Sequence, residues 1–314
     1  MKHLATCLLL LSVSLTHAAA EPAFAPKSMA YVLQADKLAS SRADAVQKLA
    51  SCDRDLIVVD AAFSSDGDWT PAEIETIRAG KKGRRVVAYV SIGEAEDYRP
   101  YWKKSWDADQ NGKPDAAAPK FLNAENPDWK GNYRVRYWQP EWQQIMLPAV
   151  DKVVAQAFDG IYLDIVDAFE FYEYDAATQG WLDDRPNPET GKTYRQDMIN
   201  WVTTIAQRAR ASRPGFLVIP QNATQLLAHA DYRELISAIG VEDLFVADKK
   251  LRTEKQSRYV LNFLAQLKPG SKPVLVIDYP KSAAIHAAAF EAAAQQGFTL
   301  LLTDRQLTKL GESK

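Results

Sequence analysis

The chain has 314 residues, of which 47% are hydrophobic and 25% are charged, and its formal net charge is −2. This nearly balanced charge argues against the strongly basic surface by which proteins bind nucleic acid. Beyond residue 20 the chain has Cys52, His229 and His286, too few for a histidine-rich zinc site or an internal disulfide, so we expect carboxylates to carry out any catalytic chemistry.

The N-terminus has the three parts of a secretory signal peptide. Residues 1–3 are basic, residues 4–15 are mainly apolar, and residues 18–20 are three alanines that suit a cleavage site. We expect residues 1–20 to be a signal peptide and residues 21–314 to be one domain that is secreted or periplasmic. No later stretch has the roughly 20 apolar residues of a membrane span, so we expect no such span.

Eight short apolar runs alternate with helical stretches along the chain. The predicted strands are residues 29–34, 56–63, 86–92, 160–166, 216–220, 240–246, 273–278 and 299–303. The predicted helices are residues 42–50, 71–79, 140–157, 195–212, 225–239, 254–267 and 282–296. Apolar strands separated by helices favour a parallel sheet covered on both faces. The pattern predicts an α/β protein with a (β/α)₈ TIM-type barrel. A doubly wound open sheet is the alternative, although no G-x-G-x-x-G motif follows the first strand.

Two predicted connections are much longer than the others, residues 93–140 after the third strand and residues 167–194 after the fourth. Long loops in a compact domain are usually functional, and both follow the strand ends that form the active face of a barrel. Aromatic residues of the first connection and of the helix start that follows it include Trp102, Trp106, Trp129, Tyr133, Tyr137, Trp138 and Trp142. Such rings stack on sugars, although some would only anchor the loop. We predict a single domain with a long aromatic-rich insertion after strand 3 that forms a carbohydrate groove.

Acidic residues gather at the predicted strand ends. They are Asp60, Glu94, Glu96, Asp97, Asp164, Asp167, Glu242, Asp243, Asp278 and Asp304. A carboxylate beside or within an apolar run is costly to bury without a partner or a function. Single members could be ion-pair partners or helix caps, but ten at the same ends of the strands favour a functional site.

Asp164 is the central candidate. Strand alternation points it to the same face as Tyr162, towards the mouth of a barrel. Glycoside hydrolysis needs one protonated and one ionised carboxyl group beside the scissile bond. Asp167 and Glu242 are both candidates for the second group, and the apolar strand around Glu242 would raise its pKa.

Residues 107–115 match the first half of a calcium-binding loop, with oxygen ligands at alternating positions and a glycine at the turn. The acid expected at the twelfth position is replaced by Ala118. This departure favours a calcium-free turn, with a bound calcium ion as the alternative. We therefore assign no metal ligand and expect no cofactor.

Several segments together resemble one known family. They are residues 88–96, 128–138, 159–164 and 241–245. Over residues 29–307 the chain resembles glycoside hydrolase family 114, which is related to the endo-α-1,4-polygalactosaminidases. The resemblance implies a TIM-like barrel that cleaves galactosamine-containing exopolysaccharide, with Asp164 and Glu242 as the catalytic pair.

We assign substrate binding to other residues on the same face. They are Asp60, Tyr89, Glu94, Tyr137, Trp138, Tyr162, Asp167, Asn222 and Asp278. Deacetylated galactosamine chains are cationic near neutral pH, and a mouth rimmed by Asp and Glu would concentrate them. Two alternatives stay open: a non-catalytic polysaccharide-binding barrel for export or biofilm assembly, and a metal-dependent deacetylase, which the scarcity of histidine disfavours.

Overall fold

The computed structural model describes residues 24–64, 67–268 and 270–314. The predicted signal peptide, residues 1–20, lies outside the described residues. In the described part of the chain, no helix is long and apolar enough to cross a membrane.

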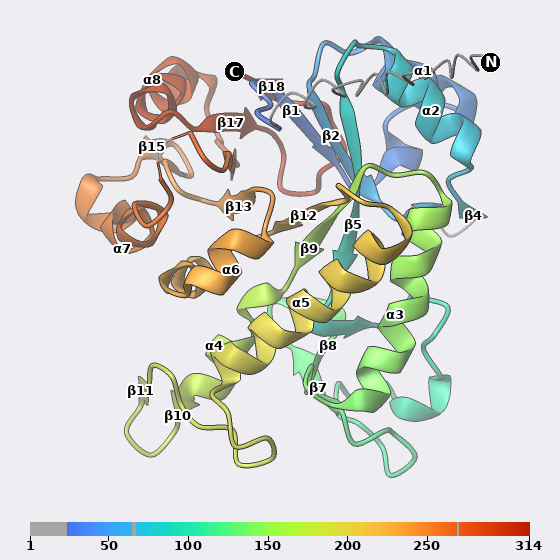
Figure 1. Ribbon diagram of the computed structural model, residues 1–314, viewed down its shortest axis with the longest axis vertical. Helices are drawn as coiled ribbons and strands as arrows, with labels where there is room; N and C mark the ends of the chain where they lie inside the picture. Colours follow the sequence, from blue (N-terminus) through green and yellow to red (C-terminus); the bar gives the residue numbers. More distant parts are fainter. Residues whose placement is uncertain (1–23, 65–66, 269) are drawn as a thin grey trace, which may run out of the picture.

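Eight parallel strands within the described residues form two sheets (Figure 1). The first has the order β1-β2-β5-β9-β12, with β1 (Met29–Val32), β2 (Leu56–Asp60), β5 (Arg85–Ser91), β9 (Gly160–Asp164) and β12 (Leu217–Pro220). The second has β13 (Ile239–Glu242), β16 (Val274–Asp278) and β17 (Thr299–Leu302), and an antiparallel strand, β18 (Glu312–Ser313), pairs with β17. These eight parallel strands occupy the eight predicted positions.

The hydrogen-bonded ladder does not close into the predicted ring. Between β12 and β13 the described residues form an isolated bridge, Gln221 with Gly240, rather than a ladder. On the other side β18 pairs with β17, and the backbone N–H of Met29 in β1 donates to Ser313 Oγ of β18 at 2.9 Å. This strand was not predicted. It contacts β17 on one side and β1 on the other, and so lies where β1 and β17 would pair in a closed barrel.

Strand alternation sorts the apolar side chains into two cores. An inner core holds side chains from both sheets, including Tyr31 of β1, Tyr162 of β9 and Ile277 of β16. An outer core lies between the strands and the helices. Gly240 is required where the inner core is tightest, because a Cβ atom there would lie 1.8 Å from the hydroxyl oxygen of Tyr162. The two sheets thus share one interior, as in a barrel.

Helices cover the outer face. They are α1 (Arg42–Ser51), α2 (Pro71–Ala79), α3 (Pro140–Ala155), α5 (Tyr194–Ser212), α6 (Ala230–Leu235), α7 (Glu254–Leu264) and α8 (His286–Gln296). A capping box between Thr70 and Glu73 begins α2, and Gly297 ends α8 with a φ of 70°. The helix predicted at residues 225–239 is wrong: a 3-10 helix, η4 (Thr224–Ala228), and α6 are separated at His229, whose backbone is extended.

The two long connections fold into small elements beyond the ends of β5 and β9 (Figure 1). The first contains a three-stranded antiparallel sheet of β6 (Glu94–Glu96), β8 (Trp129–Val135) and β7 (Leu122–Asn126), with η2 (Lys104–Trp106) between β6 and β7. The second contains η3 (Val166–Ala168), α4 (Phe169–Glu173) and a hairpin of β10 (Tyr174–Asp175) and β11 (Gly180–Trp181). The remaining short elements are β3 (Ala62–Ser64), β4 (Gly67–Asp68), β14 (Val246–Ala247), β15 (Lys250–Leu251), η1 (Ala35–Lys37) and η5 (Ala283–Ile285).

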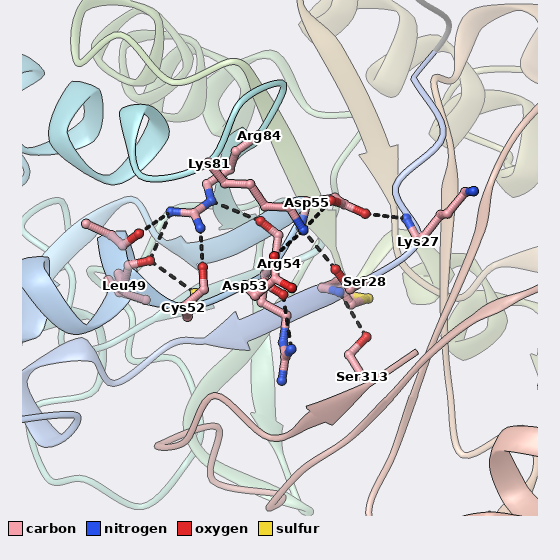
Figure 2. Close-up of polar contacts among 12 residues, drawn as sticks. Lys27, Ser28, Leu49, Cys52, Asp53, Arg54, Asp55, Lys81, Arg84 and Ser313 are labelled. Atoms are coloured by element: carbon pink, nitrogen blue, oxygen red, sulfur yellow. Dashed lines mark hydrogen bonds and ion pairs between the residues drawn. The ribbon is translucent and has the colours of Figure 1, made fainter.

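The opposite ends of the strands are held by a buried arginine (Figure 2). Arg84, which is 1% exposed, donates to the backbone carbonyls of Leu49 at 3.1 Å, Ile77 at 2.6 Å and Arg54 at 2.9 Å. Leu49 and Ile77 lie in the last turns of α1 and α2, where carbonyl groups lack partners within the helix. This end of the fold is accordingly structural, and the polar cavity described next lies at the other end.

Candidate active site

A cavity of about 1250 Å³ opens at the carboxyl ends of the strands. It exceeds the roughly 300–1,000 Å³ of most small-molecule sites, so it has room for more than a single sugar. Seven of the predicted site residues line it: Asp60, Tyr89, Glu94, Asp164, Asp167, Asn222 and Glu242. The structure therefore brings both predicted catalytic residues and most of the predicted binding residues into one space.

Asp164 and Glu242 are the last residues of β9 and β13, and Gln221 joins them. Gln221 directly follows β12, which pairs with β9 and is bridged to β13. Its amide nitrogen donates to Asp164 Oδ1 at 3.2 Å and to Glu242 Oε2 at 2.8 Å. These two carboxylate oxygens therefore lie no more than about 6 Å apart, a spacing within which a glycosidic bond can be attacked and protonated.

Each carboxylate also accepts a hydrogen bond from a tyrosine of the strand on its other side. The Tyr89 hydroxyl, from β5, donates to Asp164 Oδ2 at 2.7 Å. The Tyr279 hydroxyl, directly after β16, donates to Glu242 Oε1. Both tyrosines are buried and hold their rings in the inner core, so they fix the orientation of the two carboxylates.

The protonation of the pair follows from these contacts. Burial raises the pKa of Asp164, but the hydrogen bonds from Tyr89, the Ile165 N–H and Gln221 oppose the shift by stabilising its ionised form. Burial and the neighbouring charge of Asp164 raise the pKa of Glu242 to about 7, against the opposing hydrogen bond from Tyr279. Glu242 is therefore the carboxyl group of the pair whose pKa is raised into the neutral range.

The backbone turns sharply directly after each carboxylate. Ile165 has a φ of 55° and Asp243 a φ of 53°, which end the two strands earlier than the sequence predicted. A β-branched residue rarely adopts a positive φ, and such strain concentrates at functional sites. The turn at Ile165 returns its N–H to Asp164 Oδ1 at 2.8 Å. Gly93 packs against this turn, since a Cβ atom there would lie 2.1 Å from the Ile165 carbonyl oxygen.

Other predicted binding residues fall into two groups. Glu94 accepts hydrogen bonds from Asn126 at 2.7 Å and from Asn132 at 3.4 Å, and burial raises its pKa. Burial, with the charge of Asp164 next, raises the pKa of Asp167. Both carboxyl groups line the cavity.

Asp60 and Asn222 are already committed to neighbours. Arg99 binds both oxygens of Asp60, at 2.8 and 2.7 Å. Asn222 accepts from the backbone N–H of Glu242 at 3.1 Å, so it supports the end of β13.

Two of the predicted binding residues from the first long connection lie outside the cavity. Tyr137 is fully buried and donates to the carbonyl of Tyr194 at 2.7 Å, and Trp138 donates to Glu189 at 2.9 Å. The aromatic groove predicted there is wrong for all but one ring, because Trp129 lines the cavity while the other six pack in or against the core. Those six are Trp102, Trp106, Tyr133, Tyr137, Trp138 and Trp142.

Tyr162 and Asp278 also lie outside the cavity lining. Tyr162 is fully buried and forms part of the inner core beneath the site. Asp278 is fully buried as well, and it accepts the backbone N–H groups of Leu244 at 2.8 Å and Phe245 at 3.0 Å. Burial raises the pKa of Asp278 to about 7. Its role is to hold the turn after β13, so the prediction of substrate contact is corrected.

Sequence reasoning missed Gln221 and Tyr279, two uncharged residues that bind Asp164 and Glu242. Each directly follows a predicted strand, but neither is acidic. Position after a strand end, rather than charge, was the signal that could have found them. The cavity also takes aromatic residues from the second long connection, which the sequence analysis did not consider.

The partial calcium loop folds as an Asx-rich turn. Carboxylate oxygens of Asp107, Asp109 and Asp115 come within 4.8 Å of one another. Asp107 accepts the backbone N–H groups of Asn111 at 3.1 Å and Gly112 at 2.9 Å. These bonds account for the fold of the loop, which does not contribute to the catalytic cavity.

The sequence of this chain is similar to those of known proteins. A model of glycoside-hydrolase family GH114 matches residues 14–314. An uncharacterized protein of Deinococcus radiodurans is 37% identical over 82% of this chain and 75% of its own length. A second, from Methanocaldococcus jannaschii, is 36% identical over 74% of this chain and 63% of its own length.

Two solved structures share the fold at low sequence identity. The glycoside hydrolase domain of PelA from Pseudomonas aeruginosa superposes with a TM-score of 0.61 at 17% identity, over 92% of this chain and 98% of that domain. Aspergillus fumigatus Ega3, solved in complex with galactosamine, superposes with a TM-score of 0.61 at 19% identity, over 95% of this chain and 98% of that one.

Proposed function

The chain belongs to glycoside-hydrolase family GH114, and from this premise we propose that it cleaves galactosamine-containing polysaccharide at internal bonds, with Asp164 and Glu242 as the catalytic pair. The observation that carries the proposal is the Gln221 amide that bonds both carboxylates at the floor of a large cavity. Burial raises the pKa of both carboxyl groups, and the pKa of about 7 at Glu242 suits the general acid that glycoside hydrolysis requires.

The roles of the two residues follow from their surroundings. Glu242, with a pKa of about 7, acts as the general acid that protonates the leaving glycosidic oxygen. Ionised Asp164 attacks the anomeric carbon and forms a glycosyl-enzyme ester. The Glu242 carboxylate then takes a proton from the water that hydrolyses this ester, which restores both groups. An oxygen separation within about 6 Å fits a retaining enzyme, because inverting pairs lie roughly 6.5–9.5 Å apart.

The charge of the cavity favours a cationic substrate. Among the described residues that line it, eight are acidic and three are basic. The acidic residues are Asp60, Glu94, Glu96, Asp128, Asp164, Asp167, Glu170 and Glu242, and the basic ones are Lys130, Arg134 and Arg305. A negative cavity attracts a polymer that carries free ammonium groups. The complex of Ega3 with galactosamine supports an amino sugar as the substrate unit.

We also propose that the protein is secreted or periplasmic. Support comes from the signal-peptide pattern of residues 1–20, with residues 21–314 as the mature barrel domain. The N-terminus of the protein purified from the culture medium or the periplasm tests this proposal. A mature chain that begins near residue 21 is the expected result, and an intact Met1 in the cytoplasmic fraction would contradict it.

Product analysis tests the activity. The purified protein is incubated with α-1,4-linked galactosamine polymer, its N-acetylated form and neutral polysaccharides, and the products are identified by mass spectrometry. We expect a ladder of short oligosaccharides from the galactosamine polymer. Binding of that polymer without any product after long incubation would instead support the non-catalytic polysaccharide-binding barrel.

A further inference from the structure

Exposed aromatic rings gather around the cavity. In the described part of the chain, five large apolar side chains that line it are at least 39% exposed: Tyr98, Trp129, Phe171, Tyr174 and Trp181, with Trp181 the most exposed at 64%. Single exposed rings are ordinary on a protein surface. A group of them around a polar cavity is typical of a ligand-binding groove.

The two long connections are joined, so that their rings belong to one surface. The Arg134 guanidinium of β8 lies 4.3 Å from the centre of the Phe171 ring in α4. Asn123 of β7 donates to the Tyr172 hydroxyl at 2.8 Å. These contacts connect the β7–β8 arm, which carries Trp129, to the segment that leads into the β10–β11 hairpin. Figure 1 shows the two arms at the same end of the molecule, with α4 near the hairpin.

The hairpin is fixed at its base although its rings are exposed. Buried Glu173 pairs with Arg195 of α5 at 2.8 Å, and Asp183 pairs with the same arginine at 2.6 Å. The Trp181 ring lies 5.1 Å from the Tyr174 ring at an interplanar angle of 62°. The rings are therefore presented from an anchored element, and binding would require little additional ordering.

Acidic side chains lie among these rings. Asp128 adjoins Trp129 in sequence, and Glu170 adjoins Phe171, and all four line the cavity. Gln225 donates to Glu170 at 2.5 Å, which orients this partly buried carboxyl group. A surface that alternates rings and acids suits a chain whose units have an apolar ring face and a cationic substituent.

We propose that Trp129, Phe171, Tyr174 and Trp181 form an aromatic wall that binds the sugar rings of an amino-sugar polymer beyond the units held at the catalytic pair. Arg134 lies over Phe171, whereas Trp129 and Trp181 are 51% and 64% exposed and offer the larger accessible ring surface. The wall rests on the proposed function for its substrate, and it gives the protein a preference for long chains over short ones.

Binding to an inactive protein tests the wall directly. In the Asp164→Asn protein, Trp129→Ala and Trp181→Ala are each compared by affinity electrophoresis in gels that contain deacetylated α-1,4-galactosamine polymer. Leu251→Ala is the control, because Leu251 of β15 is a 39% exposed apolar residue that does not line the cavity. We expect each tryptophan variant to raise the dissociation constant about tenfold, the effect of losing a binding aromatic residue, and the control to leave it unchanged.

Unchanged affinity in both tryptophan variants would overturn the proposal, as would a failure of the Asp164→Asn protein to bind the polymer at all. An unchanged midpoint of thermal unfolding shows that each variant is folded and lacks only the aromatic ring. In the active protein, the loss of kcat/KM in Trp181→Ala should be greater on polymer than on a galactosamine trisaccharide. A chain that binds the polymer through the wall but yields no product would reject the proposed activity and retain this site.

Discussion

The hydroxyl group of Tyr279 opposes the upward shift of the Glu242 pKa, and the Tyr279→Phe variant removes this group alone. The hydroxyl donates to Glu242 Oε1, which stabilises the ionised form and lowers the pKa of Glu242 against the effect of burial. Arg305 lies 4.1 Å from the centre of the Tyr279 ring, a contact that phenylalanine keeps. The change therefore isolates one hydrogen bond to the proposed acid.

The size of the effect follows from the energy of that bond. A buried hydrogen bond to a charged group contributes roughly 1.5–3 kcal/mol, and about 1.36 kcal/mol corresponds to one pH unit. The general acid must be protonated, so activity falls as the pH rises through the pKa of Glu242, about 7. Without the hydroxyl group, this basic limb should move upward by about one to two pH units.

The assay is kcat/KM for galactosamine polymer as a function of pH. The amines of the substrate titrate too, but they contribute equally to every variant on the same polymer. Tyr89→Phe is the matched control, because it removes the hydroxyl that donates to Asp164 and should raise the acid limb instead. A Tyr279→Phe profile that moves only on its acid side, or not at all, would refute the assignment of Glu242 as the acid.

Other predictions concern the support of the pair and the fold. Gln221→Leu should lower kcat by about 100-fold and move both limbs of the pH profile upward, because the amide donates to both carboxylates. A lower rate with both limbs unmoved would show that Gln221 contributes only to packing. The first product, observed by proton NMR, should keep the α anomer, and a β anomer would contradict the short carboxylate separation. Asp278→Ala should lower the free energy of unfolding by about 2 kcal/mol, because two backbone N–H groups lose their acceptor; an unchanged denaturation midpoint would speak against this structural role. Gly240→Ala should cost about 1–3 kcal/mol in the same assay, and Tyr162→Phe should relieve part of the loss; equal loss in the double variant would contradict the steric explanation.

Strand positions were predictable because their signals are local. Apolar runs such as residues 56–60 and 274–278 can be buried only as interior strands, and the capping residues at Thr70 and Pro71 mark the start of α2. The helix predicted at residues 225–239 was wrong because its apolar pattern continues through the extended break at His229. The edge strand β18 has only two residues, too few to show a pattern.

The sequence located the acidic residues at the strand ends but did not distinguish those that line the cavity from those that stabilise the fold. Asp164 and Asp278 both end apolar strands, yet Asp164 accepts hydrogen bonds from cavity side chains as well as from the backbone, whereas Asp278 accepts the backbone N–H groups of Leu244 and Phe245. The donors to Asp278 come from the loop after β13, and the path of that loop in space cannot be read from the residues around Asp278. The aromatic residues pose the same problem, because composition alone does not separate the buried Trp142 from the exposed Trp129.

The most direct test of the account is the turnover of galactosamine polymer by the Asp164→Asn and Glu242→Gln variants, measured as new reducing ends. Each change should lower kcat by about 10³-fold or more while the protein still folds and binds the polymer, because each removes one of the two groups that the reaction needs. Full activity in both variants would contradict the assignment of this pair as the catalytic centre.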